Sequence, residues 1–466
     1  MRNCFLVVCI LATSVASAQD AAPLTDAEQE AMQSINERSV LGTVSFLSSD
    51  EMAGRDTPSR ELTIASAYVA ARLRGAGLEG LGPEGSFYQT HTIQTTQPPR
   101  NPARLTAEDG AVTNLLVVTG SDEDLEVSGR VLSAKEAQSS DKPAIAIMPE
   151  IRVPPQVAGN PAYLLAMAAR DVRSLAEKGV KVVLVEYSDE SVLPEMAERL
   201  LDKALMPRRG MTPACSVVLV PQSMNLAGQS VQLSVDAQRT VDEPVHNVLG
   251  ILRGSDPQLS QEAIIISAHL DHIGMSSAGA DPINNGADDN ATGVTAVVSM
   301  ADAFTALKAR PARSVIFCTF WGEEKGLVGS SRFVEKPLWP LEKIAANINI
   351  EMVGRPEKDA REKAWMTGWV HSNLGAVMNA GAKRAGVEIF HREDVSEMLY
   401  KRSDNYPFVN AGVIAHSFSA GSLHGDYHQP SDEWQKLDIP HMTKVIQGLF
   451  AGSLHVAQGA MVEKRK

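Results

Sequence analysis

The chain has 466 residues, enough for two or three domains, and its formal net charge of −13 at pH 7 disfavours nucleic acid and acidic membrane surfaces as partners. Of its four cysteines, two lie in the first nine residues, and Cys215 and Cys318 lie far apart. Neither a disulfide framework nor a zinc–thiolate site is therefore expected, and stability must come from a hydrophobic core.

Residues 1–18 have the layout of a secretory signal peptide. Arg2 precedes an apolar run at residues 5–11, and the small residues Ala16, Ser17 and Ala18 end the segment. The apolar run is shorter than the roughly 20 residues that a membrane-spanning helix needs. We therefore expect cleavage after Ala18, secretion to the medium or the periplasm, and no membrane anchor.

The next part of the chain, residues 19–110, is expected to form the helical start of the main domain. Apolar residues at helical spacing predict helices over residues 26–46 and 64–76, and residues 47–55 between them have the composition of a loop.

From residue 111 to residue 236 the pattern changes to short strands. Three apolar runs, at residues 114–119, 143–148 and 180–185, are typical of strands, and a helix is expected after the second. We interpret residues 111–236 as an inserted smaller domain that is either α/β or rich in β-strands. It loosely resembles a protease-associated insert.

Residues 237–466 alternate strands and helices, which predicts an α/β domain with a mixed, largely parallel central sheet flanked by helices. The buried strands are expected at residues 263–267, 314–320, 344–350 and 412–418. A helix is expected at residues 292–307, where apolar residues recur at helical spacing.

Side chains of the kinds that bind metals follow each of these strands. They are His269, Asp271 and His272 after the first strand, Glu323 and Glu324 after the second, Glu351 after the third, and Tyr427 and His428 after the last. Asp288 and Asp289 lie just before the predicted helix. Because parallel strands end at one edge of a sheet, we expect these side chains to converge there.

The adjacent acidic residues indicate a bound cation. Glu323 and Glu324 follow an apolar run, where two like charges repel each other and lose hydration unless a cation lies beside them. Histidine and carboxylate ligands without cysteine suit zinc, although manganese and cobalt bind such sets too. Two histidines, two terminal carboxylates and one bridging carboxylate suffice for two zinc ions about 3.5–4 Å apart, and a further carboxylate next to a ligand can act as the general base.

Residues 246–438 resemble the di-zinc aminopeptidase family, which includes bacterial secreted leucyl-type aminopeptidases and relatives of glutamate carboxypeptidase and glutaminyl cyclase. The segments that carry the resemblance are Asn247-Val248-Leu249-Gly250, Ser267-Ala268-His269-Leu270-Asp271-His272, Asn285-Gly286-Ala287-Asp288-Asp289-Asn290-Ala291-Thr292-Gly293, Gly322-Glu323-Glu324-Lys325-Gly326, Asn349-Ile350-Glu351-Met352-Val353-Gly354-Arg355 and Tyr427-His428-Gln429-Pro430-Ser431-Asp432.

The resemblance implies a zinc-exopeptidase fold and a secreted aminopeptidase that hydrolyses peptides with two zinc ions. The roles that it implies are His269 and Glu351 on one metal, Glu324 and His428 on the other, Asp289 bridging both, Glu323 as general base, Asp271 orienting His269, and Tyr427 as a hydrogen-bond donor to the oxyanion or a packing residue.

Two departures from the family pattern, one rival ligand and three alternative functions accompany this interpretation. Glu351 stands where aspartate is usual, Asn405 stands where histidine is frequent, and His424 is a rival for the role of His428. Carboxypeptidase action stays open, because Arg355 and the pair Lys401-Arg402 could hold a terminal carboxylate. A binding protein without metals, or a glutaminyl cyclase with one zinc, would need fewer of these ligands.

Overall fold

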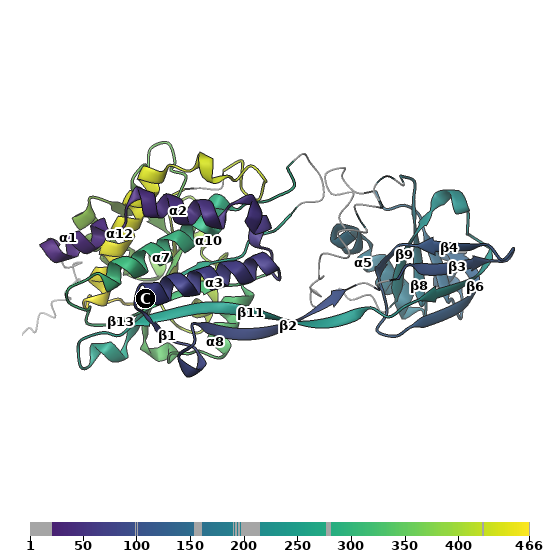
Figure 1. Cartoon of the computed structure of the whole chain (residues 1–466), viewed down its shortest axis with the longest axis horizontal. Coiled ribbons are helices and arrows are strands. Elements are labelled where there is room, and N and C mark those ends of the chain that lie inside the picture. The colour runs from purple at the N-terminus through teal and green to yellow at the C-terminus, as the bar shows by residue number, and fades with distance from the viewer. Residues whose placement is uncertain are drawn as a thin grey trace, which may run out of the picture.

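The computed structural model describes residues 21–465, except residues 98, 100, 153–160, 190, 192, 194–195, 197–214, 276–280 and 422–423. The predicted signal peptide lies outside the described residues. None of the described helices is long and apolar enough to cross a membrane. The chain forms a nine-stranded and an eight-stranded sheet, and two long strands run between them as a ribbon (Figure 1).

The nine-stranded sheet carries the predicted site. Its strands are β1 (Glu79–Gly80), β2 (Tyr88–Gln97), β11 (Arg239–Leu252), β12 (Ala263–His269), β13 (Ser314–Phe320), β14 (Ile344–Ile350), β15 (Lys363–Met366), β16 (Glu388–Phe390) and β17 (Ala415–Ser419). They follow the order β1-β11-β13-β12-β14-β17-β15-β16, and β2 pairs with β11. The four central strands are parallel, whereas β11 and β15 join them antiparallel. The expected mixed, largely parallel sheet is thus confirmed.

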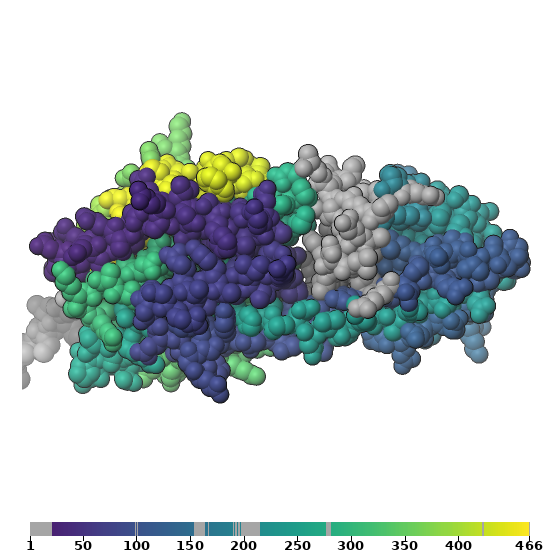
Figure 2. All heavy atoms as spheres, viewed as in Figure 1, coloured from purple at the N-terminus to yellow at the C-terminus, as the bar shows by residue number. Residues whose placement is uncertain are grey.

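Helices cover both faces of this sheet. They are α1 (Asp26–Gln33), α2 (Glu37–Leu47), α3 (Arg60–Gly75), α7 (Thr292–Thr305), α8 (Val328–Glu335), α9 (Leu374–Ala382), α10 (Ser396–Leu399), α11 (Asn405–Asn410) and α12 (Ile439–Ala457). The amino-terminal helices lie beside α12, so that the purple and yellow ends of the chain adjoin in Figure 2.

Side chains that alternate between the two faces of the central strands form two separate hydrophobic cores. In β12, Ile264 and Ile266 pack with apolar residues of α7 and α12, whereas Ile265 belongs to a cluster with Phe333 of α8 and Phe408 of α11. Successive side chains of a strand point to opposite faces, so a continuous apolar run is required where both faces are covered. This burial fixes the register, and with it the positions of the strand ends.

The amino-terminal prediction of one helix over residues 26–46 was wrong in one respect, because the structure has two helices there. The break lies at Asn36, whose side-chain Oδ1 accepts a hydrogen bond of 3.1 Å from the backbone N–H of Ser39. Asparagine satisfies the free N–H groups at a helix start better than it continues a helix. The segment expected as a loop contains a short 3₁₀ helix, Asp50–Arg55, in which Ala53, Gly54 and Arg55 have positive φ.

The eight-stranded sheet is built from residues between β2 and β11. Its strands are β3 (Ala103–Ala107), β4 (Val112–Leu115), β5 (Val117–Thr119), β6 (Leu125–Ser133), β7 (Ile145–Met148), β8 (Val182–Tyr187), β9 (Ser216–Pro221) and β10 (Ser230–Val235), and its helices are α4 (Ala134–Ser139) and α5 (Pro161–Glu177). The strand order is β4-β3-β10-β6-β7-β8-β9-β5. Strands β6 to β9 are parallel. Apolar residues of α5 pack against Val183 and Val185 of β8.

Candidate metal centre

The carboxyl ends of the four central strands bring the predicted site residues together. His269 is the last residue of β12, Glu323 and Glu324 follow β13, and Glu351 follows β14 directly. His428 comes from the segment after β17. Within the described residues, two groups of side chains could hold a metal ion, and Asp289 belongs to both. These groups are His269, Asp289 and Glu351, and His272, Asp289, Glu324 and His428.

Asp289 lies between the two histidines with one oxygen for each. Its Oδ1 is 3.2 Å from His269 Nε2, and its Oδ2 is 3.1 Å from His428 Nε2. A carboxylate in this position can bridge two metal ions, as the sequence analysis expected of Asp289.

Hydrogen bonds from two neighbouring segments fix the loop that carries Asp289. The Asp432 carboxylate accepts from the backbone N–H groups of Asp288, at 3.0 Å, and of Asp289, at 3.1 Å. Asn290 donates to the carbonyl of Ile350 and accepts from the backbone N–H of Met352, which ties the loop to the end of β14.

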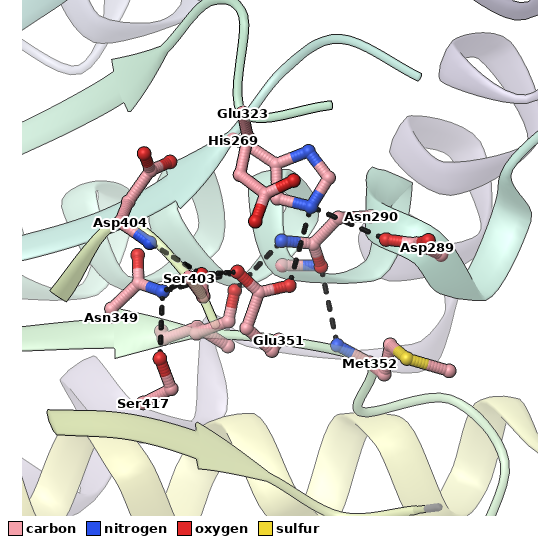
Figure 3. Close-up of polar contacts among 12 residues, drawn as sticks. His269, Asp289, Asn290, Glu323, Asn349, Glu351, Met352, Ser403, Asp404 and Ser417 are labelled. Atoms are coloured by element: carbon pink, nitrogen blue, oxygen red, sulfur yellow. Dashed lines mark hydrogen bonds and ion pairs between the residues drawn. The ribbon is translucent and has the colours of Figure 1, made fainter. Parts of the chain in front are cut away.

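Polar neighbours contact His269 and Glu351, two members of the first ligand group (Figure 3). His269 Nε2 lies 3.3 Å from Glu351 Oε2, while the other oxygen of Glu351 accepts from Ser403 Oγ and, at 3.1 Å, from Asn349 Nδ2. His269 Nδ1 is 3.0 Å from the backbone carbonyl of Asp271. Donation to that carbonyl leaves Nε2, which faces the carboxylates, as the nitrogen that could bind a metal ion.

Asp271 therefore contacts His269 through its main chain more closely than through its side chain. The Asp271 carboxylate is 3.8 Å from His269 Nδ1. It accepts instead from Thr57 Oγ1 and from the backbone N–H of Glu323, each at 3.1 Å. This buried carboxylate thus links the loops after β12 and β13.

The spacing of the facing atoms fits coordination better than hydrogen bonding. Two ligand atoms, each about 2.0–2.1 Å from a tetrahedral metal, are about 3.3 Å apart. His428 Nε2 lies 3.1 Å from Asp289 Oδ2 and 3.3 Å from Glu324 Oε1, yet it is buried and makes no hydrogen bond to any described residue. An orphaned nitrogen among carboxylate oxygens is the arrangement that a metal ion would complete.

The carboxylates also shift the pKa values of the histidines. Burial lowers the pKa of His428, but the closeness of Asp289 and Glu324 outweighs it and raises the pKa to about 10. Burial likewise lowers the pKa of His269, yet Glu351 and Glu323 raise it well above its usual value. Protons on these histidines balance the carboxylates of the metal-free chain, and a metal ion would displace them.

Glu323 lies half-buried beside the first group and does not belong to either group. Figure 3 shows its carboxyl group directed towards the space beside the His269 ring. Burial raises its pKa well above the usual value, and the neighbouring carboxylates of Asp404, Glu351 and Glu324 add to this effect, while His269 opposes it. A carboxyl group in this place can hold and release a proton next to the cluster.

Three further residues of the sequence analysis lie around the groups. The Tyr427 ring stacks on the His428 ring with 3.9 Å between centroids, so it packs against the centre, and this position is compatible with both roles expected of it. His424 Nε2 is 3.2 Å from Asp288 Oδ2 and lies outside both groups. Asn405 is buried and bonds the carbonyl of Tyr400 and the hydroxyl of Ser417.

Four residues of this centre were given no individual role in the sequence analysis, although His272 was among the side chains expected to converge there. His272 joins the second group, Asp432 holds the Asp289 loop, and Asp404 lies buried near Glu323 and accepts from Ser330 Oγ.

The fourth residue, Arg55, is fully buried and donates to the carbonyls of Leu270, Asn285 and Gly286 at 2.9–3.0 Å, and to that of Leu47. His272 and Asp432 stand inside the quoted motifs, which was a usable signal. Nothing in the sequence around Arg55 indicates its burial.

Comparison with known proteins shows which family the segment that carries this centre resembles. Residues 247–451 match the model of peptidase family M28. The chain is 25% identical over 273 residues to aminopeptidase YwaD of Bacillus subtilis, covering 57% of this chain and 54% of that protein. It is 31% identical over 241 residues to a probable glutamate carboxypeptidase of Arthroderma benhamiae, covering 47% of this chain and 31% of that protein. The chain thus spans about half or less of the length of these curated relatives.

Solved structures show the same fold over nearly the whole chain. A zinc aminopeptidase from Bacillus subtilis aligns with a TM-score of 0.54 at 16% identity and covers 92% of this chain and 98% of its own. An aminopeptidase from Aneurinibacillus sp. strain AM-1 aligns with a TM-score of 0.50 at 17% identity and covers 93% of this chain and 96% of its own. Residues 247–451 are therefore similar to peptidase family M28.

Proposed function

We propose that the chain is a zinc-dependent aminopeptidase that removes single residues from the amino-terminal end of peptides. The observation that carries this proposal is the pair of ligand groups that share Asp289, one oxygen facing each histidine. Two zinc ions are proposed, one held by His269 and Glu351 and the other by Glu324 and His428. The zinc named in the description of a structural relative supports this choice of metal.

The side chains of the centre supply the remaining chemistry. When bound, the metal ions would polarise the scissile carbonyl, acidify water and stabilise negative charge. Glu323 would take the proton of the attacking water and pass it to the leaving amine, for which its raised pKa and its place beside the ligands suit it. Tyr427 stacks on His428 and would donate from its hydroxyl to the oxygen that becomes negative.

The ion pairs around the centre favour recognition of an amine over recognition of a carboxylate. Arg355, the cation closest in sequence to Glu351, is paired with Asp426 at 2.5 Å, and Asp426 also accepts from Lys436 at 2.8 Å. Lys401 lies over the ring of Tyr406. A terminal carboxylate needs a free cation, ideally an arginine fork. Carboxylates, in contrast, gather at the centre and can hold a free amino group.

Carboxypeptidase action is the second candidate, favoured by the similarity to a probable glutamate carboxypeptidase. A peptide panel separates the two. We expect hydrolysis of peptides with a free amino terminus, loss of hydrolysis on acetylation of that terminus, and little effect of amidating the carboxyl end. Arg355→Met serves as a matched variant, because it should leave KM nearly unchanged for an aminopeptidase. Normal cleavage of acetylated peptides with sparing of amidated ones would establish a carboxypeptidase instead.

We also propose that the enzyme is exported after removal of residues 1–18 and that residues 111–236 form an inserted domain. The composition of the first 18 residues supports the former, and the separate eight-stranded sheet supports the latter. Amino-terminal sequencing of the exported protein, expected to begin at Gln19, tests the cleavage site.

A further inference from the structure

His272 contacts the second ligand group in a different way from the other histidines. It follows β12 by three residues and is completely buried. Its Nδ1 lies 2.9 Å from Glu324 Oε1 with the geometry of a hydrogen bond, whereas it is 3.8 Å from Asp289 Oδ2. The ligand nitrogens of His269 and His428, in contrast, each lie at 3.1–3.3 Å from two carboxylate oxygens.

The surroundings of the other ring nitrogen, Nε2, distinguish whether His272 Nδ1 binds a metal or donates a hydrogen bond. A histidine that binds a metal nearly always donates its other N–H to a carbonyl or carboxylate, as His269 does to the carbonyl of Asp271. His272 Nε2 is buried and has no hydrogen-bond partner among the described residues. A ligand role for Nδ1 would leave a buried N–H at Nε2 without an acceptor. Donation from Nδ1 places the proton where an acceptor exists.

Three neighbours hold the His272 ring in place. Its backbone N–H donates to the carbonyl of Arg55 at 3.2 Å, and the ring of His428 stands edge-on to it at 5.4 Å. A Cβ atom at Gly286 would lie 2.5 Å from His272 Cγ, so only glycine allows the Asp289 loop to pass this close to the ring. The ring therefore has little freedom to turn away from Glu324.

We propose that His272 is a positioning residue, which donates from Nδ1 to Glu324 Oε1 and fixes the orientation of that carboxylate for metal binding. This inference rests on the proposed function, because it concerns the metal that Glu324 and His428 would share. Its effect is confined to that metal. His269 and Glu351 belong to the other ligand group, which shares only Asp289 with the group of His272.

Two nearly isosteric variants, His272→Asn and His272→Leu, test the proposal. Asparagine carries an N–H donor at the position of Nδ1, and leucine carries none. In competition with a chelator, the full-length parent should retain two zinc equivalents. The leucine variant should bind one of them about 10–100-fold more weakly, the usual effect of losing such a supporting contact, and the asparagine variant should bind both within a few-fold of the parent.

The outcomes separate the possible roles. Equal loss of one zinc in both variants would make His272 a ligand and overturn the proposal, and unchanged affinity in both would reduce it to packing. A parent chain that binds no zinc would instead refute the proposed function. The pair His441→Asn and His441→Leu is the control, because His441 is equally buried but accepts from the backbone N–H of Glu362 and belongs to neither group. Neither control should change zinc retention.

A measurement on the parent covers the case in which the leucine variant does not fold. Nitrogen NMR of labelled histidines in the zinc-loaded protein should show His272 protonated at Nδ1 and bare at Nε2. The reverse tautomer, with metal on Nδ1, would overturn the proposal. The asparagine variant identifies the resonance.

Discussion

Replacing Arg55 with methionine should destabilise the nine-stranded sheet with its helices (the nine-stranded body) and, at the same time, the metal centre. The guanidinium is fully buried and donates to four backbone carbonyls, from the helix end at Leu47, from the loop at Leu270, and from Asn285 and Gly286. Burial lowers the Arg55 pKa, against the effect of nearby Asp271, to about 10, so the side chain is still charged at pH 7. Methionine would fill most of the apolar space but leave the carbonyls without donors.

Each buried acceptor left without a partner costs about 1–3 kcal/mol. The four bonds share one side chain and do not add, so we expect the free energy of unfolding to fall by about 3–5 kcal/mol, the range for breaking a buried charged network. Urea unfolding followed by tryptophan fluorescence measures this value. All five tryptophans lie between residues 321 and 434, so the signal reports on the nine-stranded body alone.

The exposed Arg38 of α2 supplies the control, since Arg38→Met should leave the urea midpoint unchanged. A midpoint for Arg55→Met equal to those of the parent and the control would refute the reasoning. Lysine at position 55 should rescue only part of the loss, because its ammonium has three donors at one point where the guanidinium has five in a plane.

Three further predictions concern the centre and the core. Glu323→Gln should keep the metal content and lower hydrolysis by about 10²–10⁴-fold, whereas Glu324→Gln should lose metal; equal metal loss in both variants would contradict the roles assigned to the pair. Zinc binding at pH 7 should release protons, because the raised pKa values of His269 and His428 keep both protonated without metal, and calorimetry in buffers of different ionisation enthalpy measures the release. Burial lowers the pKa of His416 to about 4, so between pH 7 and pH 4 the unfolded chain binds a proton that the folded chain does not. Stability should fall by about 3 kcal/mol over this interval, and the loss should be smaller in His416→Asn.

The strands of the main sheet could be predicted from the sequence because burial on both faces makes them continuous apolar runs. The boundaries expected for residues 314–320 and 344–350 agree with β13 and β14. The ligand candidates followed from these strand ends, since parallel strands end at one edge. The split between α1 and α2 was missed because the apolar pattern continues past Asn36, where the cap depends on a reciprocal pair of hydrogen bonds between Asn36 and Ser39.

Long-range contacts account for what the sequence did not predict. Arg55 meets three of its four acceptors more than 200 residues further along the chain, and no local pattern around it indicates such contacts. His272 was visible in its motif, but its role depends on a glutamate that a different strand brings to it. The exact limits of the inserted domain stay a prediction, and residues 103–107 form a strand of the second sheet.

The ribbon of β2 and β11 offers a route to a minimal enzyme. Gln97 and Arg239 face each other as the outermost pair of its ladder, so the chain leaves for the second sheet and returns from it through one cross-strand pair. A two-residue Asn-Gly turn is the favoured connection between such partners in a hairpin. Joining Gln97 to Arg239 in this way would excise the eight-stranded sheet and leave every strand of the larger sheet in its order. The ladder thus makes the second body a module that protein engineering can remove, exchange or graft.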